Sequence, residues 1–136
     1  MEDIDIVVEA QVKYTESKDK VAAAVTNLFG PDGELRIEDD RVMFLSTKRS
    51  SLQLLKDQFR DRHIRSAARR LLLSGSEDSN QAVLLLNKQA ATVRIAALCD
   101  DPRESPLGPI VLRIRSQNIG EVIDWLTKGY DSGSSE

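Results

Sequence analysis

The chain has 136 residues, of which 40% are hydrophobic and 30% charged, and its formal net charge at pH 7 is −3. These values are typical of a folded domain and argue against a disordered chain, and no apolar run approaches the ~20 residues that span a bilayer. The acidic N-terminus and the single cysteine, Cys99, favour a cytoplasmic protein in a reducing compartment and exclude an intrachain disulfide.

Hydrophobic periodicity divides the chain into strands and helices, because apolar residues recur at every second position in half-buried strands and at every third or fourth in helices. The predicted elements are, in chain order, a strand over 4–14, a helix between 15 and 30, a hairpin of strands over 35–38 and 41–46, a helical region over 50–73, strands over 82–86, 92–99 and 110–115, and a helix between 118 and 129. Residues 74–80 are polar and predict a flexible loop.

Capping and breaking residues set several of these boundaries. Thr15 or Ser17 is suited to cap the first helix, which Gly30 ends, and Asn118 is suited to cap the last. The long helical region breaks near His63. Each signal is local, so it predicts where an element begins or ends and not what the element packs against.

The order of these elements indicates the fold class. Strands that follow one another with short connections favour an α+β fold in which a mostly antiparallel sheet has helices packed on one face. We expect a single α+β domain over 1–129 and a disordered C-terminal tail over 130–136.

The sequence offers little support for catalysis or metal binding. One histidine and one cysteine cannot make a conventional zinc site, which needs about four such ligands. The acidic clusters at 38–40 and 100–101 are explained more simply as turn and capping residues. We therefore expect no metal, no cofactor and no enzymatic activity. A small-molecule enzyme or regulator that uses Lys88, His63 and a carboxylate in a cleft is a third hypothesis.

Basic residues concentrate in the middle of the chain. Residues 1–40 carry four basic and eleven acidic side chains, whereas 41–70 carry nine basic and two acidic. Arginines three or four positions apart share a helix face, and the guanidinium group binds phosphate oxygens bidentately. Such a surface predicts salt-sensitive binding to a nucleic-acid backbone, and the alternative is a solvated face paired with the acidic first third. The candidate RNA contacts are Lys48, Arg49, Arg62, Arg65, Arg69 and Arg70, with Lys88 as a further candidate.

Two late strands carry arginines of their own. Arg94, Arg113 and Arg115 fall on the polar positions of the runs 92–99 and 110–115, so we expect them on the open face of the sheet. Aromatic residues make up only 4% of the chain, so this face lacks the stacking residues of single-strand RNA readers. Recognition of RNA backbone and shape is the expected mode.

Four segments, SAARRLLLSG, NKQAATVRIAAL, ESPLGPI and EVIDWL, occur in an order and spacing that resemble an archaeal family of uncharacterised proteins described as predicted RNA-binding or exosome-associated. The similarity spans residues 4–127. The resemblance implies a fold like that of the ribosomal protein that binds 5S rRNA, and it implies no catalytic residue set. The matching positions that become candidates for a shared structural or binding feature are Lys88, Gln89, Glu104, Ser105, Pro106, Gly108, Asp124 and Trp125.

This chain departs from the family after EVIDWL, where relatives continue with a Pro-Arg stretch and this sequence reads TKGYDSGSSE. We predict a non-enzymatic binding module that contacts structured RNA or a ribonucleoprotein by neutralising phosphates. The alternative is a protein–protein adaptor, or a homodimer whose sheet face or edge strand is the interface.

Overall fold

A computed structural model describes residues 3–74, 76, 80–105 and 107–127; the predicted tail at 130–136 lies outside these residues. The elements, in chain order, are β1 (Asp5–Gln11), α1 (Lys18–Phe29), β2 (Glu34–Ile37), β3 (Arg41–Ser46), the 3-10 helix η1 (Arg49–Leu52), α2 (Gln53–Asp61), α3 (Arg65–Ser74), β4 (Gln81–Asn87), α4 (Lys88–Thr92), β5 (Leu98–Cys99), the 3-10 helix η2 (Pro102–Glu104), β6 (Pro109–Arg115) and α5 (Ile119–Thr127). The predicted α+β class is confirmed.

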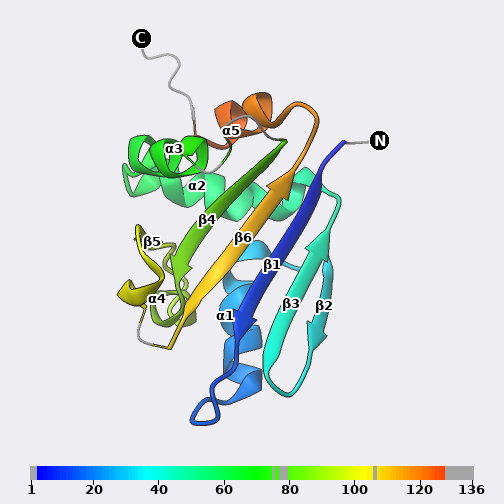
Figure 1. The fold of residues 1–136 in the computed structure, drawn as a ribbon, viewed down its shortest axis with the longest axis vertical. Coiled ribbons are helices and arrows are strands. Elements are labelled where there is room, and N and C mark those ends of the chain that lie inside the picture. The colour runs from blue at the N-terminus through cyan, green and yellow to red at the C-terminus, as the bar shows by residue number, and fades with distance from the viewer. Residues whose placement is uncertain (1–2, 75, 77–79, 106, 128–136) are drawn as a thin grey trace.

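The six strands form one antiparallel sheet in the order β2-β3-β1-β6-β4-β5 (Figure 1). β1 lies between β3 and β6, and its Val8 stands opposite Phe44 on one side and Leu112 on the other. All three side chains are buried. The sheet therefore places segments from both ends of the chain next to each other at its centre.

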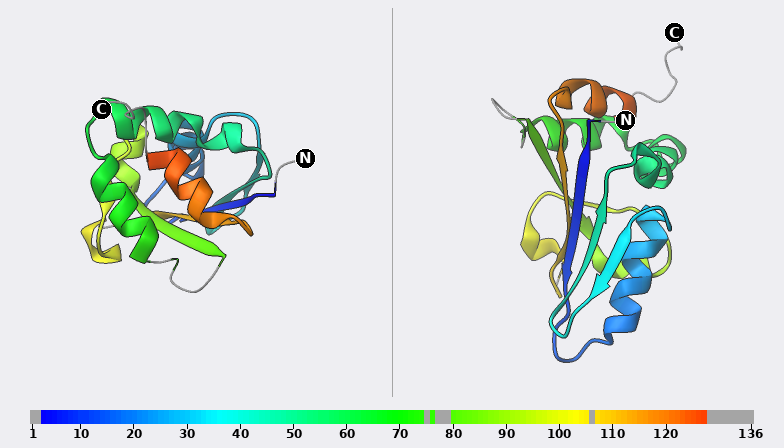
Figure 2. Two further views of the ribbon diagram at one scale, coloured as in Figure 1. Left: turned by 90° about the horizontal axis from the view of Figure 1, so that it is seen from above. Right: turned by 90° about the vertical axis from the view of Figure 1, so that its right-hand side faces the viewer.

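The α-helices lie on one face and at one end of this sheet, while the three-residue η2 lies beside the other face. α1 and α2 lie behind the strands in Figure 1, and α3 and α5 gather at the end where β4 begins and β6 ends (Figure 2). In β1, Ile6, Val8 and Ala10 are buried toward the helices, while Val7 and Glu9 are half-buried on the other face. We call that second face, formed by the strand residues that alternate with the buried ones, the open face.

Two of the predicted helix boundaries are confirmed. Ser17 precedes α1, and its Oγ accepts a hydrogen bond from the amide of Lys20 at 3.4 Å. Gly30 follows α1 with a positive φ of 75°, which glycine adopts without steric cost. The predicted break near His63 separates α2 from α3.

The end of α2 has the hydrogen bonds of a Schellman motif. The amide of Ile64 donates to the carbonyl of Phe59 at 3.0 Å, and the amide of His63 donates to the carbonyl of Arg60 at 3.2 Å. This motif needs a left-handed residue one position past the cap, where glycine is usual. Here the residue is His63, with a φ of 58°.

The end of α4 repeats the motif. The amide of Ile95 donates to the carbonyl of Ala90 at 3.0 Å, and that of Arg94 donates to the carbonyl of Ala91 at 3.0 Å. Arg94 occupies the left-handed position with a φ of 66°. Both helices therefore end on exposed side chains where glycine would be less strained.

Replacing either left-handed residue by glycine, as His63→Gly or Arg94→Gly, should raise the free energy of unfolding by about 0.5–1 kcal/mol, because relief of strain outweighs the added freedom of the unfolded chain. Urea denaturation, monitored by circular dichroism, measures this change in the free energy of unfolding. Ser66→Gly, at an exposed position inside α3, is the control and should destabilise the protein. A loss of stability at both His63 and Arg94 would contradict the strain assigned to them.

The strand predicted over 92–99 is wrong for most of its length. Asn87 caps a helix instead, because its Oδ1 accepts a hydrogen bond from the amide of Ala90 at 2.8 Å. After the turn at Arg94, only Leu98 and Cys99 pair with β4. Arg94 therefore does not lie on the open face, and its carbonyl instead accepts a hydrogen bond from the side chain of α2 residue Gln58 at 2.8 Å.

Among the described residues, no helix has the length and apolar character needed to cross a membrane.

Candidate nucleic-acid interface

The basic segment folds into η1, α2 and α3, which follow one another along the helix side of the molecule (Figure 2). The structure distributes the seven candidate residues among different environments. Lys48, Arg62 and Arg70 are exposed, Arg49, Arg65 and Arg69 are half-buried, and Lys88 is buried. Only part of the predicted stripe is therefore available to a ligand.

Trp125 of α5 brings two basic side chains of this surface together. The guanidinium carbon of Arg49 lies 5.2 Å from the ring centroid, and Nζ of Lys56 lies 5.5 Å from it. Both distances fall within the range of cation–π attraction. Arg49 comes from η1 and Lys56 from α2, so the indole of α5 contacts cations from two other elements. These contacts give Trp125, one of the positions matching the family, a structural role.

Two of the candidate arginines are engaged by carboxylates of the same chain. Arg69 pairs with Asp124 of α5, and its guanidinium also donates to Oγ1 of Thr127 at 3.5 Å. Arg70 lies 3.9 Å from a carboxylate oxygen of Asp100. A phosphate at either arginine would compete with an internal partner. This part of the stripe is therefore paired, but with Asp124 and Asp100 and not with the acidic first third of the chain that the alternative named.

Arg60 is paired in the same way. It contacts Asp61 at 3.0 Å and Asp57 at 3.7 Å, and the hydrogen bond that Arg60 donates to Asp61, together with the charge of that carboxylate, raises the pKa of Arg60. These pairs are solvent-exposed and contribute little to stability. They reduce the positive potential near the end of α2, whose further cations are Lys56, half-buried against Trp125, and the exposed Arg62 at the C-cap.

Lys88 is not a surface cation, which corrects its place among the RNA contacts. Its side chain is 2% exposed, and Nζ donates to the carbonyl of Gln11 at 2.7 Å, to Oε1 of Glu16 at 2.9 Å and to the carbonyl of Leu107 at 2.6 Å. An ammonium group has three protons, and all three are used. Lys88 therefore ties together the end of β1, the loop before α1 and the turn before β6. His63 lies elsewhere, at the end of α2, and is exposed, so the two do not form a catalytic pair.

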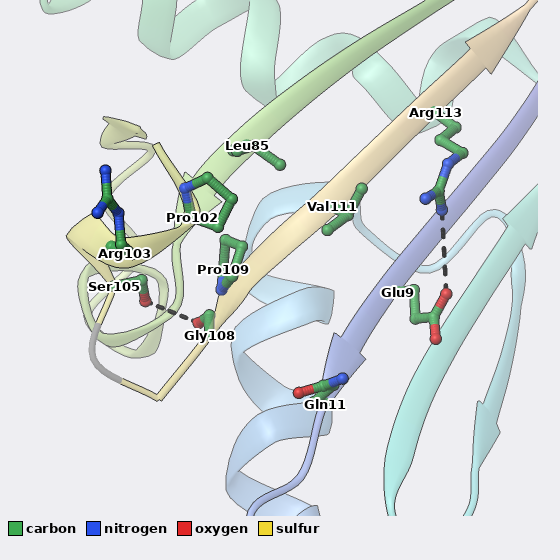
Figure 3. Close-up of a pocket in the computed structure, with 10 residues that line it drawn as sticks. All are labelled: Glu9, Gln11, Leu85, Pro102, Arg103, Ser105, Gly108, Pro109, Val111 and Arg113. Carbon is green, nitrogen blue, oxygen red and sulfur yellow. Dashed lines mark hydrogen bonds and ion pairs between the residues drawn. The ribbon is translucent and has the colours of Figure 1, made fainter. Parts of the chain in front are cut away.

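Three residues of the segment ESPLGPI, namely Ser105, Gly108 and Pro109, line a hollow on the open face (Figure 3). Its volume is about 710 Å³, and Leu85, Pro109 and Val111 form an apolar floor. Oγ of Ser105 donates to the carbonyl of Gly108 at 2.7 Å, and Gly108 has a φ of 90°. The predicted role of Gly108 in loop shape is confirmed, while Pro106 lies outside the described residues.

Charged groups of both signs rim this hollow. Arg113 lies 3.9 Å from a carboxylate oxygen of Glu9, and Arg103 pairs with Asp101 at 2.8 Å (Figure 3 shows the first of these pairs). The hydrogen bonds from Arg103 hold the pKa of Asp101 below its usual value. Because each arginine has an acidic neighbour, the open face is not a continuous positive surface. The prediction that Arg113 shares this face is confirmed by the register of β6.

The remaining titratable candidates lie apart from one another. Burial raises the pKa of the Cys99 thiol, and the carboxylates of Glu104 and Asp100 raise it further. Within the described ranges, no group of three or more His, Cys, Asp or Glu side chains is arranged to hold a metal ion.

Sequence reasoning missed two residues that organise this surface. Lys56 is not among the contacts predicted from the sequence, and the acids near it, Asp57 and Asp61, pair with Arg60. Gln58 was not considered, although its side chain binds the backbone of both Arg94 and Ala96 and holds that turn against α2. A half-buried glutamine in a basic helix is a weak signal, and only the fold reveals its partners.

These features define an α+β protein with one antiparallel sheet, a helix layer that carries the basic residues, and an open face. Residues 5–116 match the family model described as RNA binding. UPF0201 proteins from Pyrobaculum neutrophilum and Sulfolobus acidocaldarius are 36% and 37% identical over 126 residues, covering 90% of this chain and 87% and 86% of theirs. The chain belongs to this archaeal family.

Solved structures agree with this assignment. A UPF0201 protein from Methanococcus jannaschii matches with a TM-score of 0.78 and 27% identity, over 90% of this chain and 98% of that one. A second UPF0201 crystal structure matches with a TM-score of 0.76 and 29% identity, over 90% and 92% of the two chains. The likeness to the 5S rRNA-binding ribosomal protein stays a prediction.

Proposed function

We propose that this protein is a non-enzymatic module that binds the phosphate backbone of structured RNA through the surface formed by η1, α2 and the start of α3. The contacting residues are Lys48, Arg49, Lys56, Arg62 and Arg65. The description of its family as RNA binding supports this function, and the surface is where the excess of basic residues lies. Arg69 and Arg70 pair with Asp124 and Asp100, and the buried Lys88 binds Gln11, Glu16 and Leu107, so these three residues are left out of the proposed contacts.

The observation that carries the proposal is the cation pair around Trp125. Arg49 and Lys56 are like charges, so bringing them together costs free energy unless the site is compensated. The indole compensates part of that cost through its π face. A phosphate bound at this surface would supply the rest, and the exposed Lys48, which precedes Arg49 in the chain, adds a further cation to η1 and α2.

Recognition by this surface would depend on RNA shape and charge more than on base sequence. Aromatic residues make up only 4% of the chain, and Trp125 is already in contact with Arg49 and Lys56. Sequence readers of single strands rely on free aromatic faces, whereas phosphate contacts position a protein without specifying bases. The expected ligand is a folded RNA whose backbone follows η1 and α2.

The triple variant Lys48→Glu/Lys56→Glu/Arg62→Glu should bind structured RNA at least about tenfold more weakly at low salt, and the slope of log affinity against log salt should fall by about 2. Each reversed cation removes one phosphate contact and the counterion release that accompanies it. Fluorescence anisotropy with a labelled hairpin RNA, at low and physiological ionic strength, measures both quantities.

Arg103→Glu is the matched control, because its side chain is 90% exposed and lies beside the hollow on the open face. It should bind RNA as the wild type does, and circular dichroism should show both variants folded. Loss of binding in the control alone would move the interface to the open face. Absence of wild-type binding even at low salt would refute the RNA module.

A protein-binding adaptor is the second candidate function, favoured by the open face. Leu85, Pro109 and Val111 are half-buried there beside Pro102 and Arg103 of η2, and the rim carries charges of both signs. Mixed charges around an apolar floor are typical of protein interfaces. This candidate predicts that Arg103→Glu changes partner binding while the triple variant does not.

A further inference from the structure

The outer edge of the sheet at β2 has a surface that the proposed RNA module does not use. β2 pairs with β3 on one side only, and all four of its residues are exposed. Leu35 is 38% exposed and Ile37 45%, which is unusual for large apolar side chains within a strand. Glu34 and Arg36 alternate with them and lie on the other side of the strand.

The backbone of Leu35 and Ile37 points away from the sheet. The amide of Glu38 donates to the carbonyl of Arg41 at 2.9 Å, which marks those residues as a hydrogen-bonded pair of the hairpin. Bonding alternates along an antiparallel ladder, so Glu34 and Arg36 also direct their peptide groups toward β3. The peptide groups of Leu35 and Ile37 are directed outward and are available to another strand.

We propose that β2 is a self-association edge, at which it pairs antiparallel with β2 of a second copy of this chain, centred on Leu35. When two identical strands pair antiparallel and the sheet continues across them, side chains on the helix side of one strand must face side chains on the helix side of the other. The residues whose peptide groups point away from β3 must also stand opposite the same kind of residue in the second copy, so that their hydrogen bonds form. Two central registers satisfy both conditions, one centred on Leu35 and the other on Arg36. Charge distinguishes them.

Within each chain Nε of Arg36 donates a hydrogen bond to Glu34 at 2.9 Å. In the register centred on Leu35, Glu34 of each copy stands opposite Arg36 of the other, so the two internal pairs meet with opposite charges facing each other and both cross-strand pairs are attractive. In the register centred on Arg36, the two Arg36 side chains oppose each other and Glu34 opposes Glu38 of the second copy. Opposite charges across strands stabilise a pair, and like charges destabilise it. Of these two registers, only the one centred on Leu35 places opposite charges across the strands.

The residues beyond the strand do not reverse this choice. The next position outward in the favoured register places Glu38 opposite Asp32 of the second copy, which is a like-charged pair. Each is already engaged, since Glu38 accepts from Arg41 at 2.9 Å and Asp32 accepts from Ser50 at 2.6 Å. Leu35 meets Leu35 of the second copy on the helix side, which removes both from water.

A second copy is the partner because the pattern is symmetric about Leu35. Such an isologous contact closes as a dimer and does not propagate. A contact limited to two short strands buries less than the roughly 1,200 Å² of a standard interface, so the dimer should be weak and in rapid exchange. Salt should weaken it further, because the four charges are exposed.

Charge exchange tests the register. Wild type should show a weight-average mass that rises with concentration from about 10 μM to about 500 μM in sedimentation equilibrium at low salt, as a weak two-fold association requires. Glu34→Arg and Arg36→Glu should each be monomeric over that range. The double variant Glu34→Arg/Arg36→Glu should dimerise again, because the attraction is restored with the signs exchanged. Circular dichroism checks the fold of all three.

Cysteine crosslinking tests the geometry independently. Under mild oxidation Leu35→Cys should form a covalent dimer, because directly opposed residues have Cα atoms about 5.5 Å apart, within the range of a disulfide. Ile37→Cys, two positions along, should not. A wild type that is monomeric throughout, single variants that dimerise as the wild type does, or crosslinking through Ile37→Cys instead would each overturn the proposal. Dimerisation does not rest on RNA binding, and the two are measured separately.

Discussion

Replacing Lys88 with methionine should lower the free energy of unfolding by about 3–5 kcal/mol, the largest effect we expect from a single polar substitution. Methionine keeps the length of the side chain but donates no hydrogen bond. The variant leaves the carbonyls of Gln11 and Leu107 and the carboxylate of Glu16 without their shared donor. Removing one partner from a buried network costs the desolvation of every group that remains. Urea denaturation measures the loss.

Two further variants separate the buried network from a general effect of charge. Lys20→Met removes an exposed lysine from α1 and should change stability by less than about 0.5 kcal/mol. Glu16→Gln keeps an acceptor for Lys88 but removes the negative charge. Its free energy of unfolding should therefore fall by more than that of Lys20→Met and by less than that of Lys88→Met. A loss below about 1 kcal/mol for Lys88→Met would show that water replaces the ammonium group, and would contradict its role as a clamp.

The buried Lys88 also shows why the environment of a side chain could not be predicted from the sequence. Periodicity puts Lys88 between two apolar runs, which is compatible with a surface loop. Its three acceptors come from residues 77, 72 and 19 positions away, and only the pairing of β1 with β6 and the return of the chain before β6 bring them together. Local patterns carry no information about such partners.

The strands and most helices could be predicted because their signals are local. Alternation identified β1, the β2–β3 hairpin, β4 and β6, and the left-handed turn at His63 coincides with the predicted break. α4 could not be identified in this way, because a five-residue helix has too few turns to show periodicity. The apolar run after it was taken for a strand, although the turn at Arg94 leaves only two residues to pair with β4.

The position of the basic surface could be predicted from the sequence, but the pairing of its individual cations with acids could not. The excess of basic residues over 41–70 is a property of the sequence, and the structure places it on one helix layer. Which cations stay available depends on acids distant in sequence, such as Asp124, which pairs with Arg69 across 55 positions. Arg49 and Lys56 meet around Trp125 for the same reason. Charge counting therefore overestimates the number of free phosphate contacts.

Replacing Gly33 with alanine should lower the free energy of unfolding by about 2–3 kcal/mol, a value at the upper end for overpacking. An added Cβ would lie 2.5 Å from Cζ of Phe44 and 2.6 Å from the carbonyl oxygen of Leu45. Phe44 is buried and packs on Phe29, with ring centroids 5.8 Å apart, so it has little room to move. β2 must therefore shift away from β3 and weaken the hydrogen bonds between them.

Gly120→Ala is the matched control for this prediction. Gly120 lies in the first turn of α5 with no heavy atom within 4 Å of an added Cβ, so alanine should stabilise the helix by up to about 1 kcal/mol. In urea denaturation the free energy of unfolding should fall for Gly33→Ala and rise for Gly120→Ala. If Gly33→Ala were neutral, the edge strand would have to yield easily, and β2 would then be too compliant to hold the register that we propose for the dimer. A clear loss instead indicates that β3 fixes β2 in place and presents Leu35 at a defined position on the edge.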